Sequence, residues 1–252
     1  MLEQVKQQQN AYEGIYAPEQ KSEFDFHITT DPLTRYLRDR RLLKALAVLE
    51  QSNTNIREWS VLLTCGGVGG EGLFFKKNGF NNVTVSDISE NSLKICNEFD
   101  PSISTIMLNG ESLDVPDASY DLVVVQDGLH HLPRPVTGFT EMLRVAKKAV
   151  IVIEPYDSLI GNLMGTEWEE QGSAINYVYR WDKNSFTQAV KSYLLKNYKQ
   201  IRVLRFWDHG LMVSKLAGKL PKSMQLSAAK IIYGLFAPFN WVGNMFVGIL
   251  MK

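Results

Sequence analysis

The sequence is poor in the residues from which proteins build covalent or metal crosslinks. Cys65 and Cys96 are the only cysteines among 252 residues, too few for a disulfide framework or a four-cysteine zinc site. The four histidines show no metal-ligand spacing, so we expect no metal. The N-terminus also lacks the apolar segment of a secretory signal. These absences predict a reduced, cytoplasmic protein.

Net charge is absent as well. The chain has 27 Lys+Arg and 27 Asp+Glu, so no excess of positive charge indicates a nucleic-acid partner. Residues 231–251 contain no charged side chain, which is enough length to span a membrane. However, Pro238, Asn240 and Gly243 lie within this run, and residues 244–251 are predicted as the last strand. The remainder is too short to span, so we expect no transmembrane segment.

Short apolar strands alternate with helices from residue 59 onward. This rhythm predicts right-handed βαβ units and a parallel sheet. A helix is predicted before the first strand, with Asp31 as its N-cap and Pro32 at its first position. We expect four regions: an N-terminal helical cap (1–50), a nucleotide-binding core (51–155), an aromatic insertion (156–181), and the rest of the core (182–252) with an apolar helical insertion (211–241).

A glycine-rich loop, VLLTCGGVGGEG (residues 61–72), follows the first predicted strand. Glycines this dense favour a ligand lying against the backbone at a helix N-terminus, although a tight turn is the alternative. The second strand ends in Asp87, eighteen residues after Gly69, where a carboxylate would accept both ribose hydroxyls. A plain helix cap is the alternative for Asp87. Loop and acid alone leave a nicotinamide-dependent oxidoreductase and a nucleoside-cofactor methyltransferase open.

The block NGESLDVPDASYDLVVVQDGLHHLPRP (residues 109–135) separates these two classes. Its Gly-acid pair, its Ser119-Tyr120-Asp121 strand start and its Leu-His-His-Leu tail resemble the class I S-adenosylmethionine-dependent methyltransferases, above all their small-molecule group with a methyltransferase type 11-like domain. The resemblance covers residues 61–155 and the last strand. It implies a Rossmann-like, doubly wound, mostly parallel seven-stranded α/β sheet with helices on both faces and a helical and aromatic cap. It also implies S-adenosylmethionine as cofactor and a small-molecule or glycan-type acceptor.

The resemblance further implies roles for individual residues. Gly67 and Gly69 would lie under the methionine part of the cofactor, Asp87 would hold the ribose, and Glu111 with the Ser112 backbone N–H would bind adenine. The complete implied set is Thr64, Cys65, Gly66, Gly67, Gly69, Asp87, Ile88, Gly110, Glu111, Ser112, Gln126 and Asp127. Leu63 departs from the family, which places an acid there. This departure leaves open a catalytically degenerate binding protein of the same fold.

Methyl transfer from a sulfonium is an in-line displacement that needs alignment and exclusion of water. A general base is needed when the acceptor is a hydroxyl, and His130, His131 and Asp127 are the candidates, so O-methylation is slightly favoured over N-methylation. His131 has loop orientation as its alternative role. We expect acceptor contacts from Tyr16, His27, Tyr156, Trp168, Tyr177 and Trp181, unless the aromatic residues only pack the insertion. For residues 222–241 a lid, a homodimer contact and peripheral contact with a membrane all stay open.

Overall fold

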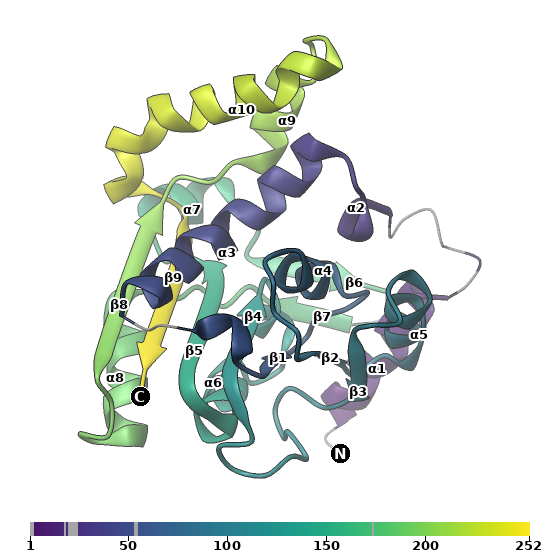
Figure 1. Ribbon diagram of the computed structural model, residues 1–252, viewed down its shortest axis with the longest axis vertical. Helices are drawn as coiled ribbons and strands as arrows, with labels where there is room; N and C mark the ends of the chain where they lie inside the picture. Colours follow the sequence, from purple (N-terminus) through teal and green to yellow (C-terminus); the bar gives the residue numbers. More distant parts are fainter. Residues whose placement is uncertain (1–2, 18, 20–24, 53–54, 173) are drawn as a thin grey trace.

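The computed structural model describes residues 3–17, 19, 25–52, 55–172 and 174–252. Its centre is a seven-stranded sheet in the order β3-β2-β1-β4-β5-β9-β8, in which only the contacts of β9 are antiparallel (Figure 1). The strands are β1 (Val61–Leu63), β2 (Val83–Asp87), β3 (Ser104–Met107), β4 (Tyr120–Gln126), β5 (Ala146–Pro155), β8 (Gln200–Phe206) and β9 (Met245–Met251). This confirms the predicted Rossmann-like sheet.

Two hydrophobic layers cover the faces of the sheet. Alternate side chains of β5 enter opposite layers: Ile151 belongs to one buried cluster and Val152 to the other. The first layer is covered by α3 (Pro32–Ser52), η2 (Ile56–Glu58), α4 (Gly70–Lys77) and α5 (Glu90–Phe99), and the second by η3 (Leu129–His131), α6 (Pro135–Val145) and α8 (Lys183–Leu194). The chain therefore winds over both faces of the sheet.

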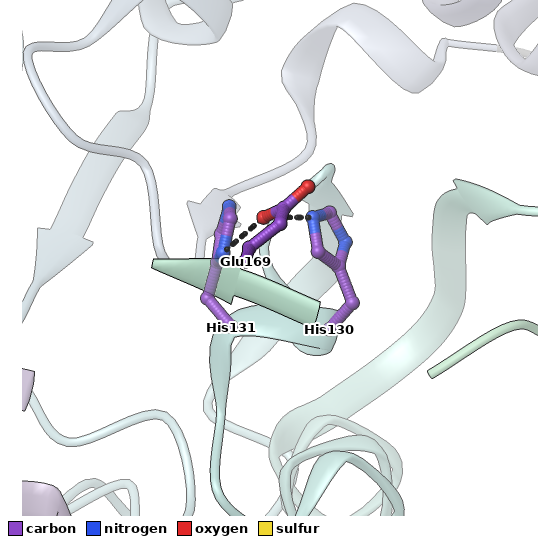
Figure 2. Close-up of side chains that lie close together, drawn as sticks. All are labelled: His130, His131 and Glu169. Carbon is purple, nitrogen blue, oxygen red and sulfur yellow. Dashed lines mark ion pairs between the residues drawn. The ribbon is translucent and has the colours of Figure 1, made fainter. Parts of the chain in front are cut away.

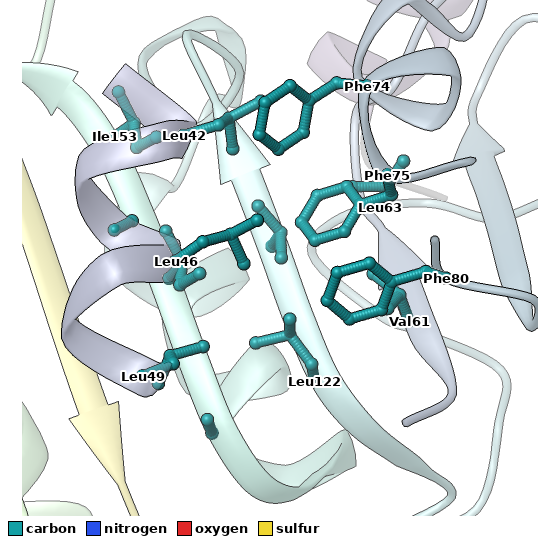
Figure 3. Close-up of a cluster of buried hydrophobic side chains, with 14 of the residues drawn as sticks. Leu42, Leu46, Leu49, Val61, Leu63, Phe74, Phe75, Phe80, Leu122 and Ile153 are labelled. Atoms are coloured by element: carbon teal, nitrogen blue, oxygen red, sulfur yellow. The ribbon is translucent and has the colours of Figure 1, made fainter. Parts of the chain in front are cut away.

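The long helix α3 packs on the first layer through regularly spaced leucines. Figure 3 shows Leu42, Leu46 and Leu49 of α3 facing Phe74 and Phe75 of α4 across the strands. The helix begins as expected, because the Asp31 carboxylate accepts from the Thr34 backbone N–H at 2.9 Å. This packing fixes α3 beside the carboxyl ends of the parallel strands.

The two insertions add short helices and a hairpin that pack against the rest of the chain. The aromatic insertion contains α7 (Leu159–Met164) and a hairpin of β6 (Trp168–Gln171) and β7 (Ala174–Tyr177). The apolar insertion forms α9 (Gly210–Ala217), α10 (Lys222–Phe236) and η4 (Ala237–Val242), and α10 packs on α3 and α9. In the described part of the chain no helix is both long and apolar enough to cross a membrane.

The polar N-terminal region adds two helices, α1 (Glu3–Ile15) and α2 (Asp25–Ile28). Helix α1 contacts α5 and the β6-β7 hairpin. Its Glu13 carboxylate accepts from the Ser89 hydroxyl and from the backbone N–H of Asn91, both at 3.1 Å, at the start of α5. Helix α1 is therefore held over the edge where β1 and β2 end.

Candidate cofactor and acceptor site

The loop between β1 and α4 bends sharply at three positions. Cys65, Gly67 and Gly69 have φ angles of 52°, 50° and 86°, a region that glycine adopts without strain. The bends turn the Gly67 backbone N–H toward the end of β2, where it donates to Asp87 at 2.8 Å. A Cβ atom at Gly67 would lie 3.0 Å from the Tyr16 hydroxyl oxygen, so this glycine permits a close approach to the loop.

Asp87 closes the loop rather than capping the next helix. Its second carboxylate oxygen accepts from the Ser89 backbone N–H at 3.0 Å, whereas the cap of α5 is Ser89 itself, whose side chain accepts from Ser92. Burial raises the pKa of Asp87, and the two backbone N–H donors partly offset the rise. The carboxylate is thus fixed at the place predicted for ribose binding.

A narrow cavity of about 30 Å³ lies beside Asp87. So small a cavity holds water but not a nucleoside while α1 stays in place. Helix α1 covers the cavity with Tyr12 and Gln8, and the Gln8 amide is hydrogen-bonded to the His131 carbonyl. The other lining residues are Cys65, Asp87, Ile88, Leu108, Gly110, Gly128, His131 and Leu132. Burial raises the pKa of the Cys65 thiol, which argues against a nucleophilic role.

Two of the predicted adenine contacts are engaged elsewhere. The Glu111 carboxylate accepts from the Arg134 Nε at 3.0 Å and also from the Arg134 backbone N–H, and it does not line the cavity. The Ser112 backbone N–H donates to the Asn109 carbonyl at 2.9 Å. In this arrangement neither group is free to bind adenine, and Gly110 is the member of this segment that lines the cavity.

The remaining predicted loop residues have structural contacts. The Thr64 hydroxyl donates to the Val124 carbonyl at 3.3 Å, and the Gly66 backbone N–H donates to the Ser86 carbonyl at 2.8 Å. A Cβ atom at Gly66 would lie 2.8 Å from a Val85 methyl group, so no larger side chain fits there. These contacts tie the loop to β4 and β2.

The opposite end of the loop gathers charged groups that suit the methionine part of the cofactor. The Glu71 carboxylate, in the first turn of α4, accepts from Arg38 Nη2 and from Gln126 Nε2, each at 3.0 Å. Two buried atoms here, Gln126 Oε1 and Arg38 Nε, have no hydrogen-bond partner among the described residues. The Gln126 oxygen beside the Glu71 carboxylate suits the ammonium group of a methionine. The free Arg38 Nε–H suits its carboxylate.

The comparisons with known proteins agree with this geometry. Residues 63–153 match the family described as "Methyltransferase domain". These residues are a methyltransferase domain, as the resemblance to the class I S-adenosylmethionine-dependent methyltransferases predicts. Its cofactor is S-adenosylmethionine. No curated protein matches the sequence significantly.

Solved structures show the same fold over nearly the whole length of this chain. A SAM-dependent methyltransferase from Thermotoga maritima is 15% identical, with a TM-score of 0.61 over 96% of this chain and 99% of that one. A methyltransferase in complex with the Haloferax volcanii Trm112 activator is 14% identical, with a TM-score of 0.62 over 95% and 96%. Magnesium protoporphyrin IX methyltransferase from Synechocystis PCC 6803, with S-adenosylhomocysteine bound, is 11% identical, with a TM-score of 0.54 over 88% and 85%.

Beyond the methionine end, Asp127 follows β4 with a φ of 51°. It pairs with Arg41 of α3 at 2.7 Å. Burial would raise the pKa of Asp127, but the charge of Arg41 and neighbouring cations lowers it, so the carboxylate stays ionised. Asp127 and Arg41 line a cavity of about 420 Å³, together with Phe26, Thr34, Leu37, Arg38, Asp208, Gly210, Leu211, Ser214 and Met245. We call this cavity the acceptor chamber.

The two adjacent histidines share one carboxylate but differ in charge. Figure 2 shows Glu169 of β6 between the rings of His130 and His131, with oxygen-to-nitrogen distances of 3.8 and 3.4 Å. The Nδ1 atom of His130 also lies 2.6 Å from the carboxylate of Glu154, which is fully buried. Burial alone would lower the pKa of His130, but the ion pair with Glu154 and the nearby Asp127 and Glu169 raise it to about 9.

His131 is neutral, whereas His130 carries a positive charge. Burial and the positive charge of His130 lower the pKa of His131 to about 3, so its ring is neutral. Its Nδ1 lies 3.2 Å from the Gln171 amide nitrogen, which ties η3 to the hairpin. One ring nitrogen from each of His130 and His131 and one carboxylate oxygen of Glu169 lie within 4.8 Å of one another, a grouping that sequence spacing does not reveal. Because His130 is protonated in this arrangement, we interpret the group as an ion-pair network.

The residues predicted to contact the acceptor lie in different parts of the structure. Tyr16 lies against the glycine loop on the cofactor side. The His27 carbonyl accepts from Arg35 at 2.9 Å, and burial with the charge of Arg38 lowers the pKa of His27 to about 4. Tyr156 and Glu169 line a cavity of about 240 Å³, which shares Met245 with the acceptor chamber. Tyr156 is the aromatic residue of the insertion that lies near the chamber.

The other three aromatic residues do not line the acceptor chamber. Trp168 and Tyr177 stack edge-to-face at 5.4 Å on the hairpin and line a separate cavity of about 300 Å³. A further cavity, about 490 Å³, also touches Tyr177 but none of the predicted cofactor residues. Trp181 is fully buried 5.2 Å from the Phe139 ring and packs the second layer of the core. Trp181 is therefore a core residue and not an acceptor contact.

Several residues of the site were missed at the sequence level. Arg35, Arg38 and Arg41 recur every third position of α3, and each bonds a group at the carboxyl edge: the Gly70 carbonyl, Glu71 and Asp127. That spacing is visible in the sequence and would have indicated one charged helix face. Glu154 gives no such signal, because it is a single acid at the end of an apolar strand.

Proposed function

We propose that this methyltransferase transfers a methyl group to a small molecule bound in the acceptor chamber. The observation that carries the proposal is the position of Asp127. It is adjacent in sequence to Gln126 at the expected methionine end, and it lines the acceptor chamber. A methyl carbon held between the methionine end of the cofactor and the acceptor chamber would face an acceptor across a short gap, as in-line displacement requires.

The residues around the loop support cofactor binding despite the missing acid at Leu63. Leu63 is buried in the first hydrophobic layer, and Glu71 brings a carboxylate to Gln126 from the next helix. When bound, S-adenosylmethionine would supply the activated methyl group. The chain's own residues would hold its ribose through Asp87 and its methionine end through Glu71, Gln126 and Arg38. This arrangement favours an enzyme over a degenerate binding protein.

We further propose a hydroxyl acceptor, with the neutral form of His130 as general base. The buried Glu154 carboxylate binds His130 Nδ1, and its other oxygen accepts from the Gly128 and Leu129 backbone N–H groups at 2.9 and 2.7 Å. A carboxylate fixed in this way orients the imidazole and stabilises its protonated form, as in other carboxylate–histidine pairs. Nε2 of His130, which lies near Glu169, is the atom that would take the proton of the hydroxyl.

Two measurements test the proposal. Isothermal titration calorimetry with S-adenosylmethionine and S-adenosylhomocysteine should show binding of both, and absence of binding of either at millimolar ligand would refute the enzyme assignment. Transfer of tritiated methyl groups to matched hydroxyl and amine compounds should then favour the hydroxyl series. Transfer confined to amines, with no effect of His130→Gln, would contradict the base role.

A further inference from the structure

The C-terminal part of the chain carries charge of one sign. Asp208 is the last acidic residue, and the 44 residues from His209 to the C-terminus contain five lysines and no acid. The chain as a whole has zero net charge, so this imbalance is local. Lys215, Lys219, Lys222 and Lys230 lie on or between α9 and α10. Helices α9 and α10 therefore carry only positive side-chain charge, and Asp31, which precedes α3, lies near Lys222.

Helix α10 is apolar on two opposite sides. One side buries Ala229 and Tyr233 against α3 and α9. The other side exposes Met224, Ile231 and Leu235, which are 54%, 63% and 69% exposed. Their spacing of seven and four residues places the three side chains in one stripe along the helix. A helix with two apolar sides and only one of them packed has an uncovered surface.

Apolar side chains are also exposed on both neighbouring elements. Phe239 and Trp241 of η4 are 53% and 72% exposed, and Leu211 of α9 is 76% exposed. In Figure 1, α9 and α10 form one end of the molecule, outside the seven-stranded sheet. We call Leu211, Met224, Ile231, Leu235, Phe239 and Trp241 the apolar surface.

We propose that the apolar surface docks on an anionic lipid bilayer. Exposed aliphatic and aromatic side chains on helices whose charged residues are all lysines are the composition of a helix that lies in a membrane interface. Lysine stems can lie along such a surface while their ammonium groups reach the lipid phosphates. A second copy of the chain fits less well, because a two-fold contact would bring together helices that carry lysines and no acid of their own.

Docking here would bring the acceptor chamber next to the membrane. Leu211 belongs to the apolar surface and also lines the chamber, whose other wall carries Arg38 and Arg41. An acceptor carried by a lipid could therefore reach Asp127 without leaving the bilayer surface. This step depends on the proposed function, whereas docking itself does not.

The test is sedimentation of the full chain with vesicles of phosphatidylcholine alone or of phosphatidylcholine with phosphatidylglycerol. We expect binding to the anionic vesicles, weaker binding at high salt, and little binding to the neutral ones. Ile231→Ser with Leu235→Ser should reduce the partition coefficient at least roughly tenfold, because two exposed aliphatic side chains no longer enter the interface. Lys222→Gln with Lys230→Gln should remove much of the preference for anionic lipid.

The matched control replaces Leu159 and Ile175, which are 78% and 66% exposed on other elements, by serine. This control should bind vesicles like the unchanged chain. All variants should keep S-adenosylhomocysteine affinity in calorimetry, which separates failure of docking from failure of the proposed function. Equal binding to neutral and anionic vesicles, or no binding, would overturn the proposal. A dimer in analytical ultracentrifugation that the Ile231→Ser and Leu235→Ser pair dissociates would assign the surface to a second copy instead.

Discussion

Replacing Glu71 by glutamine tests whether α4 supplies the acid that β1 lacks. The carboxylate lies 3.0 Å from both Arg38 Nη2 and Gln126 Nε2, and its side chain is only 12% exposed. Glutamine keeps the shape and one acceptor oxygen but removes the charge that would face the cofactor's ammonium. A hydrogen bond to a charged group contributes about 1.5–3 kcal/mol. At 1.4 kcal/mol per tenfold, that loss weakens binding by roughly 10- to 150-fold.

The assay compares two ligands by calorimetry. S-adenosylhomocysteine carries the amino-acid part, whereas 5′-methylthioadenosine keeps the nucleoside and lacks that part. We expect Glu71→Gln to weaken only the first ligand and to leave the second unchanged. The control is Glu50→Gln, because Glu50 also pairs with an arginine, Arg57, but lies on the surface away from the loop. Equal weakening of both ligands, or of neither, would show that Glu71 does not bind the amino-acid part.

Other changes address the ribose, the base and the covering helix. Asp87→Ala should weaken S-adenosylhomocysteine binding at least tenfold, since each charge-assisted hydrogen bond to a ribose hydroxyl contributes about 1.5–3 kcal/mol. Unchanged affinity with an intact circular dichroism spectrum would refute the ribose assignment. If His130 is the base, only its neutral form can take a proton, so kcat/KM should rise with pH, reach half of its maximum near pH 9 and level off above that. Glu169→Gln removes a carboxylate that raises this pKa and should move the plateau to lower pH; a flat profile, or an unmoved one, would contradict the assignment. Tyr12→Ala opens the 30 Å³ cavity and should speed association of S-adenosylhomocysteine in stopped-flow measurements, and an unchanged rate would show that α1 does not limit access.

The sheet could be predicted because its strands are apolar and regularly spaced. Buried parallel strands such as β4 must be continuously apolar, and each is followed by a helix of ordinary length. The hairpin of β6 and β7 was not predicted. Its first strand has the sequence WEEQ, and strands with polar, half-exposed side chains carry no burial signal. Local pairing around Gly172, with a φ of 59°, forms the hairpin instead.

The site was predictable where neighbouring strands of the sheet bring two residues together. Gly67 and Asp87 meet because β1 and β2 are adjacent and parallel, so the loop must lie beside the end of β2. Glu111 could not be assigned in this way, because Arg134 reaches it from the segment after η3 and competes with any ligand. Arg41 and Glu154 reach the edge from elements far apart in the sequence. Their contacts depend on how α3 and β5 pack, which no short motif records.

The replacement of the loop acid by Leu63 follows from the packing of α3. Leu63 is 2% exposed in the same cluster as Leu42 and Phe75, so a carboxylate at this position would be buried among apolar groups. Burial without a partner disfavours the ionised form. Glu71 lies instead in the first turn of α4, where the helix dipole favours negative charge, and α3 supplies Arg38 as its partner. Helix α3 thus both surrounds Leu63 with apolar groups and stabilises Glu71 through Arg38. We interpret Leu63 and Glu71 together as a move of the loop acid from the end of β1 to the start of α4.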